Sequence, residues 1–279
     1  MTASIAAIVL FAALLHATWN AVVKGAGDRT IVLGLVALGH VVPGIAMVSL
    51  APLPAAHAVP FIIASTVIHW AYYYGLNVAY RLGDLSIVYP ISRGLAPVLI
   101  ALGAQYWVGE RLPLLAWVGI SCVSAGIFLL TVRQLGQGVP VHGLGAALAV
   151  AITVAAYSIV DGVGVRSAGT TLGYVGWLFV AEICVVLFIF STRWPRLRAM
   201  PPHRIWLGLA GGVLSGAAYG LVLYAKTLAP LGVVSALRET SVIFAALIGV
   251  WLFGEGPKRI RLVAAGVVVA GIVPLALAK

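Results

Sequence analysis

Two arginines that lie inside long apolar stretches are the first candidates for chemistry. Arg93 and Arg238 each stand about seven residues, or roughly 10 Å of helix, inside such a stretch. A charged side chain at that depth of a membrane helix costs at least about 2.5–3.5 kcal/mol on insertion scales, so it persists where it is paired or binds an anion. Two interpretations are open for each arginine: an ion pair that braces the helices, or a guanidinium that binds a substrate carboxylate through two parallel hydrogen bonds.

Three acids, Asp161, Glu182 and Glu239, lie in similar apolar stretches and could complement these arginines. One of them could hold a substrate ammonium, aided by a cation–π contact with a tyrosine or tryptophan. One could instead carry a proton, because burial disfavours the ionised form of a carboxyl group. Glu182, in an otherwise apolar stretch, is the proton-coupling candidate, and the alternative is a structural partner for Arg93 or a histidine.

Other polar and aromatic residues recur three or four positions apart, so they share a helix face. Lipid offers polar groups no partner, and such faces are therefore expected to turn toward a cavity or toward one another. The alternatives are packing inside the bundle or a place in the aromatic belts at the membrane surface. The full set of candidate substrate-binding residues is Arg93, Arg238, Glu239, Asp161, His16, Trp19, Asn20, His69, Tyr73, Asn77, Tyr89, Tyr157, Tyr219 and Ser241.

The composition excludes several classes of protein. Of 279 residues, 62% are hydrophobic and only 9% are charged, whereas a soluble domain carries about 25% charged residues. A soluble enzyme, a nucleic-acid binder and a disordered chain are therefore excluded. The sequence also lacks the usual catalytic, ATP-binding and metal-ligand motifs, so we expect a protein that is not an enzyme and uses no cofactor or metal.

Ten apolar stretches are long enough to cross a bilayer core about 30 Å thick. We therefore predict an all-α membrane protein with ten transmembrane helices, the first of which is retained rather than cleaved as a signal peptide. The expected ranges are 4–24, 31–51, 58–80, 86–107, 114–133, 144–165, 172–190, 204–227, 232–253 and 260–278.

The positive charges are distributed unevenly between the expected loops. Apart from Arg93 and Arg238, eleven Lys and Arg residues follow odd-numbered spans, while four follow even-numbered spans or end the chain. The positive-inside rule then places the odd-numbered loops in the cytoplasm and both termini outside.

The two halves of the sequence resemble each other at an offset of about 145 residues. Five spans per repeat is an odd number, so the second repeat must enter the membrane with opposite orientation around a central cavity, as in many secondary transporters. We expect a first five-helix repeat over 1–135, a linker over 136–143 and a second repeat over 144–279. The aligned pairs are Tyr74-Gly75-Leu76 with Tyr219-Gly220-Leu221, Arg93 with Arg238, Gly109-Glu110 with Gly254-Glu255, and Ala125-Gly126-Ile127 with Ala270-Gly271-Ile272.

Two further features are the segment His16-Ala17-Thr18-Trp19-Asn20 and the Gly-Glu pairs after the fourth and ninth spans. Together with the ten spans and the two repeats, they resemble the EamA family of the drug/metabolite transporter (DMT) superfamily. The resemblance covers the whole chain, and bacterial amino-acid exporters look most similar. It implies a multi-pass protein of the bacterial inner membrane that exports amino acids or other small metabolites. It also implies cytoplasmic termini, whereas the distribution of positive charge places both termini outside, and both alternatives are open.

Glycines and prolines indicate how the helices pack and bend. Gly208, Gly212, Gly216 and Gly220 recur every four residues and predict close helix packing. Pro90 and Pro97 flank Arg93 and are expected to bend its helix as a hinge.

Together these features predict a secondary transporter that works by alternating access and moves amino acids, including aromatic or large apolar ones. The alternative within this class is a transporter of organic cations, drugs or other small metabolites. A lipid-modifying membrane enzyme and a scaffold subunit are disfavoured because the polar residues lie within the spans. The expected partners are a small-molecule substrate, the lipid bilayer and, as a candidate coupling ion, the proton; we expect no nucleic acid and a monomer or weak dimer.

Overall fold

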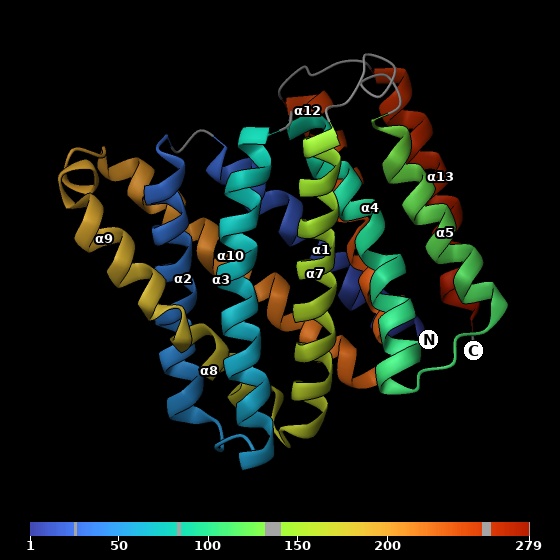
Figure 1. Ribbon diagram of the computed structural model, residues 1–279, viewed down its shortest axis with the longest axis horizontal. Coiled ribbons are helices and arrows are strands. Elements are labelled where there is room, and N and C mark those ends of the chain that lie inside the picture. Colours follow the sequence, from blue (N-terminus) through green and yellow to red (C-terminus); the bar gives the residue numbers. More distant parts are fainter. Residues whose placement is uncertain (25–26, 83–84, 132–140, 253–257, 279) are drawn as a thin grey trace.

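A computed structural model describes residues 1–24, 27–82, 85–131, 141–252 and 258–278, which form helices and contain no strand (Figure 1). The prediction of an all-α protein is therefore confirmed for these residues. The helices are α1 (Ala3–Val23), α2 (Arg29–Leu50), α3 (Val59–Leu82), α4 (Leu85–Gly103), α5 (Leu114–Leu129), α7 (Val141–Ser167), α8 (Thr171–Ala181), α9 (Ile183–Arg198), α10 (Pro202–Leu228), α11 (Leu231–Arg238), α12 (Ser241–Leu252) and α13 (Lys258–Leu277), with short turns of helix at Ala56–Ala58 (η1) and Ala104–Val108 (η2).

Seven helical stretches of the described residues are long and apolar enough to cross a membrane, and Leu114–Leu129 is a shorter apolar helix. The protein is thus a multi-pass membrane protein. Two of the seven stretches are divided: α8 gives way to α9 at Glu182, and α11 ends at Arg238 before α12 begins at Ser241. The expected linker over 136–143 falls largely outside the described residues, and α7 begins within it, at Val141.

Local sequence sets the start of α2. The Asp28 carboxylate accepts hydrogen bonds from the N–H groups of Thr30 at 2.9 Å and Ile31 at 3.3 Å, which caps the helix. Burial raises the pKa of Asp28. The N–H donors of Ile31 and Thr30 and the guanidinium of Arg196 together lower it by more, so the pKa of Asp28 lies below its ordinary value. This carboxylate is therefore fully ionised at neutral pH.

The glycine stripe of α10 lies against α2 and α8. A Cβ at Gly208 would come within 2.7 Å of Leu35, and one at Gly212 within 2.8 Å of the Gly39 Cα, so only glycine allows the backbones of α10 and α2 to approach this closely. Further along, Gly216 faces His40 and Phe179, and Gly220 faces Val175.

The last helix of each half pairs with the other. A Cβ at Gly119 of α5 would lie 2.9 Å from the Gly271 carbonyl oxygen of α13, and one at Gly271 would lie 3.0 Å from the Gly119 carbonyl oxygen. These two helices stand together at one side of the bundle (Figure 1), and the Met1 amino group donates to the Ala278 carbonyl oxygen at 2.9 Å. The two termini therefore lie side by side.

A bend was expected in α4, in the first half of the chain, whereas the structure has a break between α11 and α12, in the second half. Helix α4 runs as one helix across Pro90 and Pro97, whereas its counterpart in the second half, which has no proline there, is divided at Glu239 and Thr240. The hydroxyl of Thr240 donates to the Leu237 carbonyl oxygen at 2.6 Å, and this local bond helps to close the turn.

Candidate functional site

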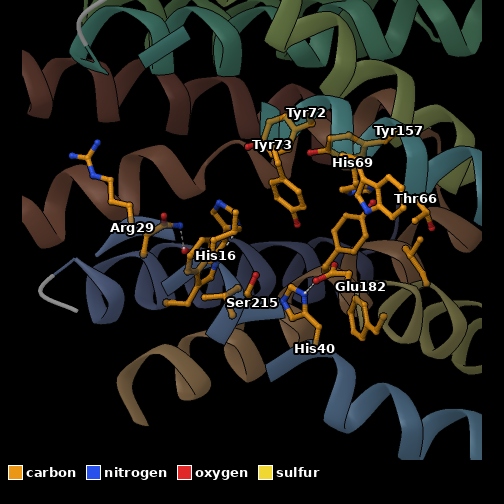
Figure 2. Close-up of a pocket in the computed structure, with 18 of the residues that line it drawn as sticks. His16, Arg29, His40, Thr66, His69, Tyr72, Tyr73, Tyr157, Glu182 and Ser215 are labelled. Atoms are coloured by element: carbon orange, nitrogen blue, oxygen red, sulfur yellow. Dashed lines mark hydrogen bonds and ion pairs between the residues drawn. The ribbon is translucent and has the colours of Figure 1, made fainter. Parts of the chain in front are cut away.

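A cavity of about 400 Å³ lies between the helices of both halves (Figure 2). Its wall combines aromatic rings, three histidines, three arginines and one glutamate, and it reaches the first turn of α2. The lining residues are His16, Trp19, Asn20, Arg29, Thr30, Leu33, Val36, His40, Thr66, His69, Trp70, Tyr72, Tyr73, Tyr89, Arg93, Tyr157, Leu178, Phe179, Glu182, Ser215, Tyr219 and Arg238.

Most of the residues predicted from the sequence converge on this cavity although they come from seven different spans. Those that line it are Arg93, Arg238, His16, Trp19, Asn20, His69, Tyr73, Tyr89, Tyr157, Tyr219 and Glu182. They meet because each is costly in lipid, and the bundle interior is the place where water and other polar groups are available.

The two arginines share one acid. The Arg93 Nε lies 2.7 Å from the Glu239 carboxylate, and the Arg238 Nη1 lies 3.8 Å from its other oxygen. Glu239 is 1% exposed and Arg93 4%. Each guanidinium also lies over a ring, Arg93 over Tyr89 and Arg238 over Tyr219. Arg93 therefore has the closer ion pair, although its buried Nη2 has no hydrogen-bond partner, and Arg238, in the last turn of α11, has the longer contact.

Aromatic rings form a continuous surface beside the arginines. His69 stacks on Tyr157 with ring centroids 4.2 Å apart, and Tyr219 meets both rings edge-on, at 6.0 Å and 6.4 Å. The His69 ring is fixed because its Nδ1 lies 2.8 Å from the Ser65 carbonyl oxygen. This surface can accept a flat or apolar group, and its faces are suited to a cation.

Glu182 stands at the junction of α8 and α9, on another part of the wall. Its carboxylate lies 3.0 Å from the His40 Nδ1, and the His40 ring stacks on Phe179 at 4.9 Å. In Figure 2, Glu182 and His40 lie on one side and the rings of His69, Tyr73 and Tyr157 on the other. The histidine partner matches one of the two alternatives weighed for Glu182.

Three residues of α1 that line the cavity are joined by hydrogen bonds within the helix. The Trp19 indole N–H donates to the His16 Nδ1 at 3.2 Å, and the Asn20 amide donates to the His16 carbonyl oxygen at 2.8 Å. The His16 ring, labelled in Figure 2, therefore has a fixed orientation.

Three of the predicted residues that the structure describes do not line the cavity. Asp161 is fully buried and accepts hydrogen bonds from the hydroxyls of Tyr174 and Tyr219, and Glu239 lies behind Arg93. Ser241 is buried at the start of α12. Asn77 lies in α3, and its side chain falls outside the part of the chain that the structure describes.

Sequence reasoning did not select several cavity residues. Arg29 and His40 line the cavity but were not among the predicted residues. Lys226, which does not line the cavity, was not predicted either; it is 1% exposed and its Nζ donates to the Ser158 carbonyl oxygen at 2.8 Å. Its position seven residues after Tyr219, on the same face of one helix, was the available signal. The other cavity residues outside the prediction are Thr30, Leu33, Val36, Thr66, Trp70, Tyr72, Leu178, Phe179 and Ser215.

One end of the bundle is tied across several elements. Arg166, near the end of α7, pairs with Glu110 at 2.8 Å and donates to the carbonyl oxygens of Lys226 and Ala229. Both oxygens of Glu110 accept from the N–H of Leu231 at the start of α11. These residues do not line the cavity, which instead reaches Arg29.

Among the described residues, no group of three or more His, Cys, Asp and Glu side chains could hold a metal ion. The charged and aromatic groups of the cavity are suited to binding an organic molecule through ion pairs and ring contacts.

Many secondary transporters are helical bundles that hold a polar cavity among their spans. Residues 141–277 match the EamA-like transporter family, which confirms the resemblance to EamA proteins of the DMT superfamily. This family consists of small-molecule transporters rather than enzymes.

The comparison with solved structures covers the whole chain. One structure, titled only "Crystal structure of protein", superposes with a TM-score of 0.79 over 99% of this chain and 98% of that chain, at 20% sequence identity. At this identity the likeness shows the fold alone. No curated protein matches the chain.

Proposed function

We propose that this chain is a secondary transporter of amino acids, including aromatic or large apolar ones. The observation that carries this proposal is the combination of Arg238, Glu182 and an aromatic surface in one cavity. A carboxylate, an ammonium and an apolar side chain on one molecule would each meet a complementary group there.

Arg238 is the proposed carboxylate-binding residue. Glu239 is closer to Arg93, at 2.7 Å, than to Arg238, at 3.8 Å, so the charge of Arg93 is offset more completely. A substrate carboxylate could replace part of the weaker contact and receive two parallel hydrogen bonds from the guanidinium. Arg93 and Glu239 would then hold Arg238 in place.

Glu182 is the proposed ammonium-binding residue, with the rings of Tyr73, Tyr157 and Tyr219 around the substrate side chain. The cavity wall carries three arginines and one glutamate, and Glu239 behind Arg93 offsets only one of these positive charges. An organic cation would be repelled by this excess, which disfavours the alternative substrate class.

We also propose ten spans arranged as two inverted repeats. The packing supports this because exchanging the halves maps contacts onto contacts: α1 with α10 corresponds to α7 with α3, and α4 with α5 corresponds to α12 with α13. The adjacent termini fit an even number of spans. Gly254 and Glu255, aligned with Gly109 and Glu110, lie outside the described residues.

We propose alternating access because the two ends of the cavity differ. The tie between Arg166 and Glu110 closes one end, and the cavity reaches Arg29 at the other. Opening the opposite end would require this ion pair to separate, with the break at Glu239 and the prolines of α4 as proposed hinges. Export, a bacterial inner-membrane location and a monomer or weak dimer complete the proposal.

Counterflow in proteoliposomes tests the proposed function. Liposomes loaded with unlabelled phenylalanine should take up labelled phenylalanine, and tetraphenylphosphonium should not compete. Arg238→Met should reduce counterflow by about tenfold to a hundredfold, because a hydrogen bond to a charged group contributes about 1.5–3 kcal/mol. Arg196→Met, at an exposed surface ion pair, is the matched control and should leave counterflow unchanged.

Lack of counterflow with leucine, phenylalanine and a panel of other amino acids would contradict the proposal. Normal counterflow of Arg238→Met would remove the carboxylate-binding role from this residue.

A further inference from the structure

A polar seam between α7 and α10 lies directly behind the cavity wall. Asp161 of α7 is 0% exposed, and one of its oxygens accepts from the Tyr174 hydroxyl of α8 at 3.0 Å. The other oxygen accepts from the Tyr219 hydroxyl of α10. Tyr219 lines the cavity, whereas Asp161 and Tyr174 do not, so one hydroxyl links the buried carboxyl group to the substrate space.

A buried amine completes the seam. Lys226 follows Tyr219 by two turns of α10, and its Nζ donates to the carbonyl oxygen of Ser158, one turn before Asp161 on α7. Lys226 is 1% exposed, and none of the described carboxylates lies within 4.0 Å of its amine. A buried ammonium bonded only to a neutral carbonyl is costly, so this site can gain or lose a proton at less expense than a tight ion pair.

The other ionisable groups near the seam come from every helix packed against α7. They are His69 on α3, Arg93 on α4, Tyr174 on α8, Tyr219 and Lys226 on α10, and Arg238 on α11. Arg93 is held by Glu239, and Arg238 lies over the Tyr219 ring at 5.8 Å. Arg166 of α7, paired with Glu110, donates to the Lys226 carbonyl oxygen. The cationic groups are thus on the cavity side of Tyr219 or at the Lys226 end of the seam, and Asp161 itself is bonded to neutral hydroxyls.

We propose that Asp161 and Lys226 together hold the coupling proton of transport, and that the Tyr219 hydroxyl conducts it between this pair and the cavity. In the uptake step, Tyr219 passes its hydroxyl proton to the Asp161 carboxylate and takes one proton from a hydronium ion in the cavity, which is left as water. The pair gains one proton and one positive charge, and no bond between heavy atoms changes. Release reverses both transfers, and the proton belongs to the pair rather than to either residue.

The same tyrosine connects the proton to the substrate. Its ring contacts Arg238, the proposed carboxylate-binding residue, while its hydroxyl contacts Asp161. A substrate that moves the guanidinium or the ring changes the hydrogen bond to Asp161, so substrate binding and proton binding are linked and each changes the affinity for the other by the same factor. This inference rests on the proposed transport function and assigns the coupling proton to the seam instead of Glu182.

Transport of labelled phenylalanine by the full chain in proteoliposomes tests the inference. The readout is the ratio of transport driven by an imposed pH difference to counterflow without one, because this ratio is independent of the amount of active protein. In the parent protein the ratio should be well above one. It should fall to one in Asp161→Asn, Lys226→Met and Tyr219→Phe.

Two tyrosines serve as controls. Tyr224→Phe alters an exposed ring on α10 that does not line the cavity, and the ratio should not change. Tyr174→Phe removes the other hydroxyl donor to Asp161 and should keep most of the ratio, because this hydroxyl has no access to the cavity. An equal fall in Tyr174→Phe and Tyr219→Phe would overturn the conduction path.

Other outcomes separate this inference from the proposed function. Absence of counterflow in the parent protein would overturn both. Counterflow without any effect of the pH difference, or a ratio that falls in Glu182→Gln but stays at the parent value in Asp161→Asn and Lys226→Met, would overturn the seam alone. Should one variant not fold, the other two positions give the same test.

Discussion

Glu239 and Asp161 are two buried acids whose burial is compensated in different ways. Glu239 lies between two guanidiniums, with the nearer at 2.7 Å, whereas Asp161 accepts from two tyrosine hydroxyls. The cations beside Glu239 are held in place, so this acid can position Arg93 and Arg238. The donors to Asp161 are neutral hydroxyls, and this is the acid that we propose as part of the proton site. Equal burial thus leads to a positioning role in one place and to a proposed proton site in the other.

The comparison also bears on the arginines. The sequence left two roles open for each, and the structure gives Arg93 the closer ion pair and Arg238 the longer contact. The arginines at the two aligned positions thus differ in their surroundings, and we propose that Arg93 braces α4 against the break between α11 and α12 while Arg238 remains available to the substrate.

Glu239→Gln should show the largest effect on stability. It leaves two buried guanidiniums without their shared counter-charge, and removing one partner of a buried pair costs about 3–5 kcal/mol. The measurement is thermal unfolding of the purified protein in detergent. Arg93→Met should be similarly destabilising, and the double variant should recover part of the loss. A Glu239→Gln protein as stable as the parent would show that the cluster is not held by charge.

Glu182→Gln should weaken substrate binding with a smaller effect on stability, because Glu182 lies at the cavity wall rather than behind it. Loss of a charged hydrogen-bond partner corresponds to about 1.5–3 kcal/mol, or about a tenfold to hundredfold rise in Kd for phenylalanine. Binding isotherms in detergent provide the measurement. An unchanged Kd would exclude Glu182 as the ammonium-binding residue, and His40→Gln tests whether the effect arises from its histidine partner.

Asp161→Asn should reduce stability by only about 1 kcal/mol, since the side-chain amide oxygen can still accept a tyrosine hydroxyl. The same thermal measurement, made side by side with Glu239→Gln, decides the comparison. Equal destabilisation by the two neutral substitutions would mean that Asp161 is also held by charge, with Lys226 as its partner.

Asp28→Asn should have the smallest effect and provides an exposed reference. Asparagine caps a helix about as well as aspartate, so the substitution removes mainly the surface ion pair with Arg196, which contributes about 0.2–1 kcal/mol. Because the pKa of Asp28 is lowered in the folded protein, its contribution is complete above about pH 4 and is lost as the pH falls through the lowered pKa. The difference in thermal unfolding between parent and variant should be smaller at pH 3 than at pH 7.

The sequence by itself determined the helical class and most of the cavity. Long apolar stretches require helices in a membrane, and residues such as Arg238, His69 and Tyr219 are too costly to face lipid, so their convergence could be expected without coordinates. The periodicity also placed the close packing at Gly208 and Gly212.

Only the tertiary structure decided which charges meet. Glu239 could have faced the cavity as readily as Glu182, because hydropathy describes each helix alone. The spacing of Lys226 from Tyr219 placed both on one helix face, but it did not show that Lys226 is buried. The partner of a buried group depends on the rotation and depth of the neighbouring helices, which are set by contacts between residues far apart in the chain, as between Gly39 and Gly212 or Asp161 and Tyr219.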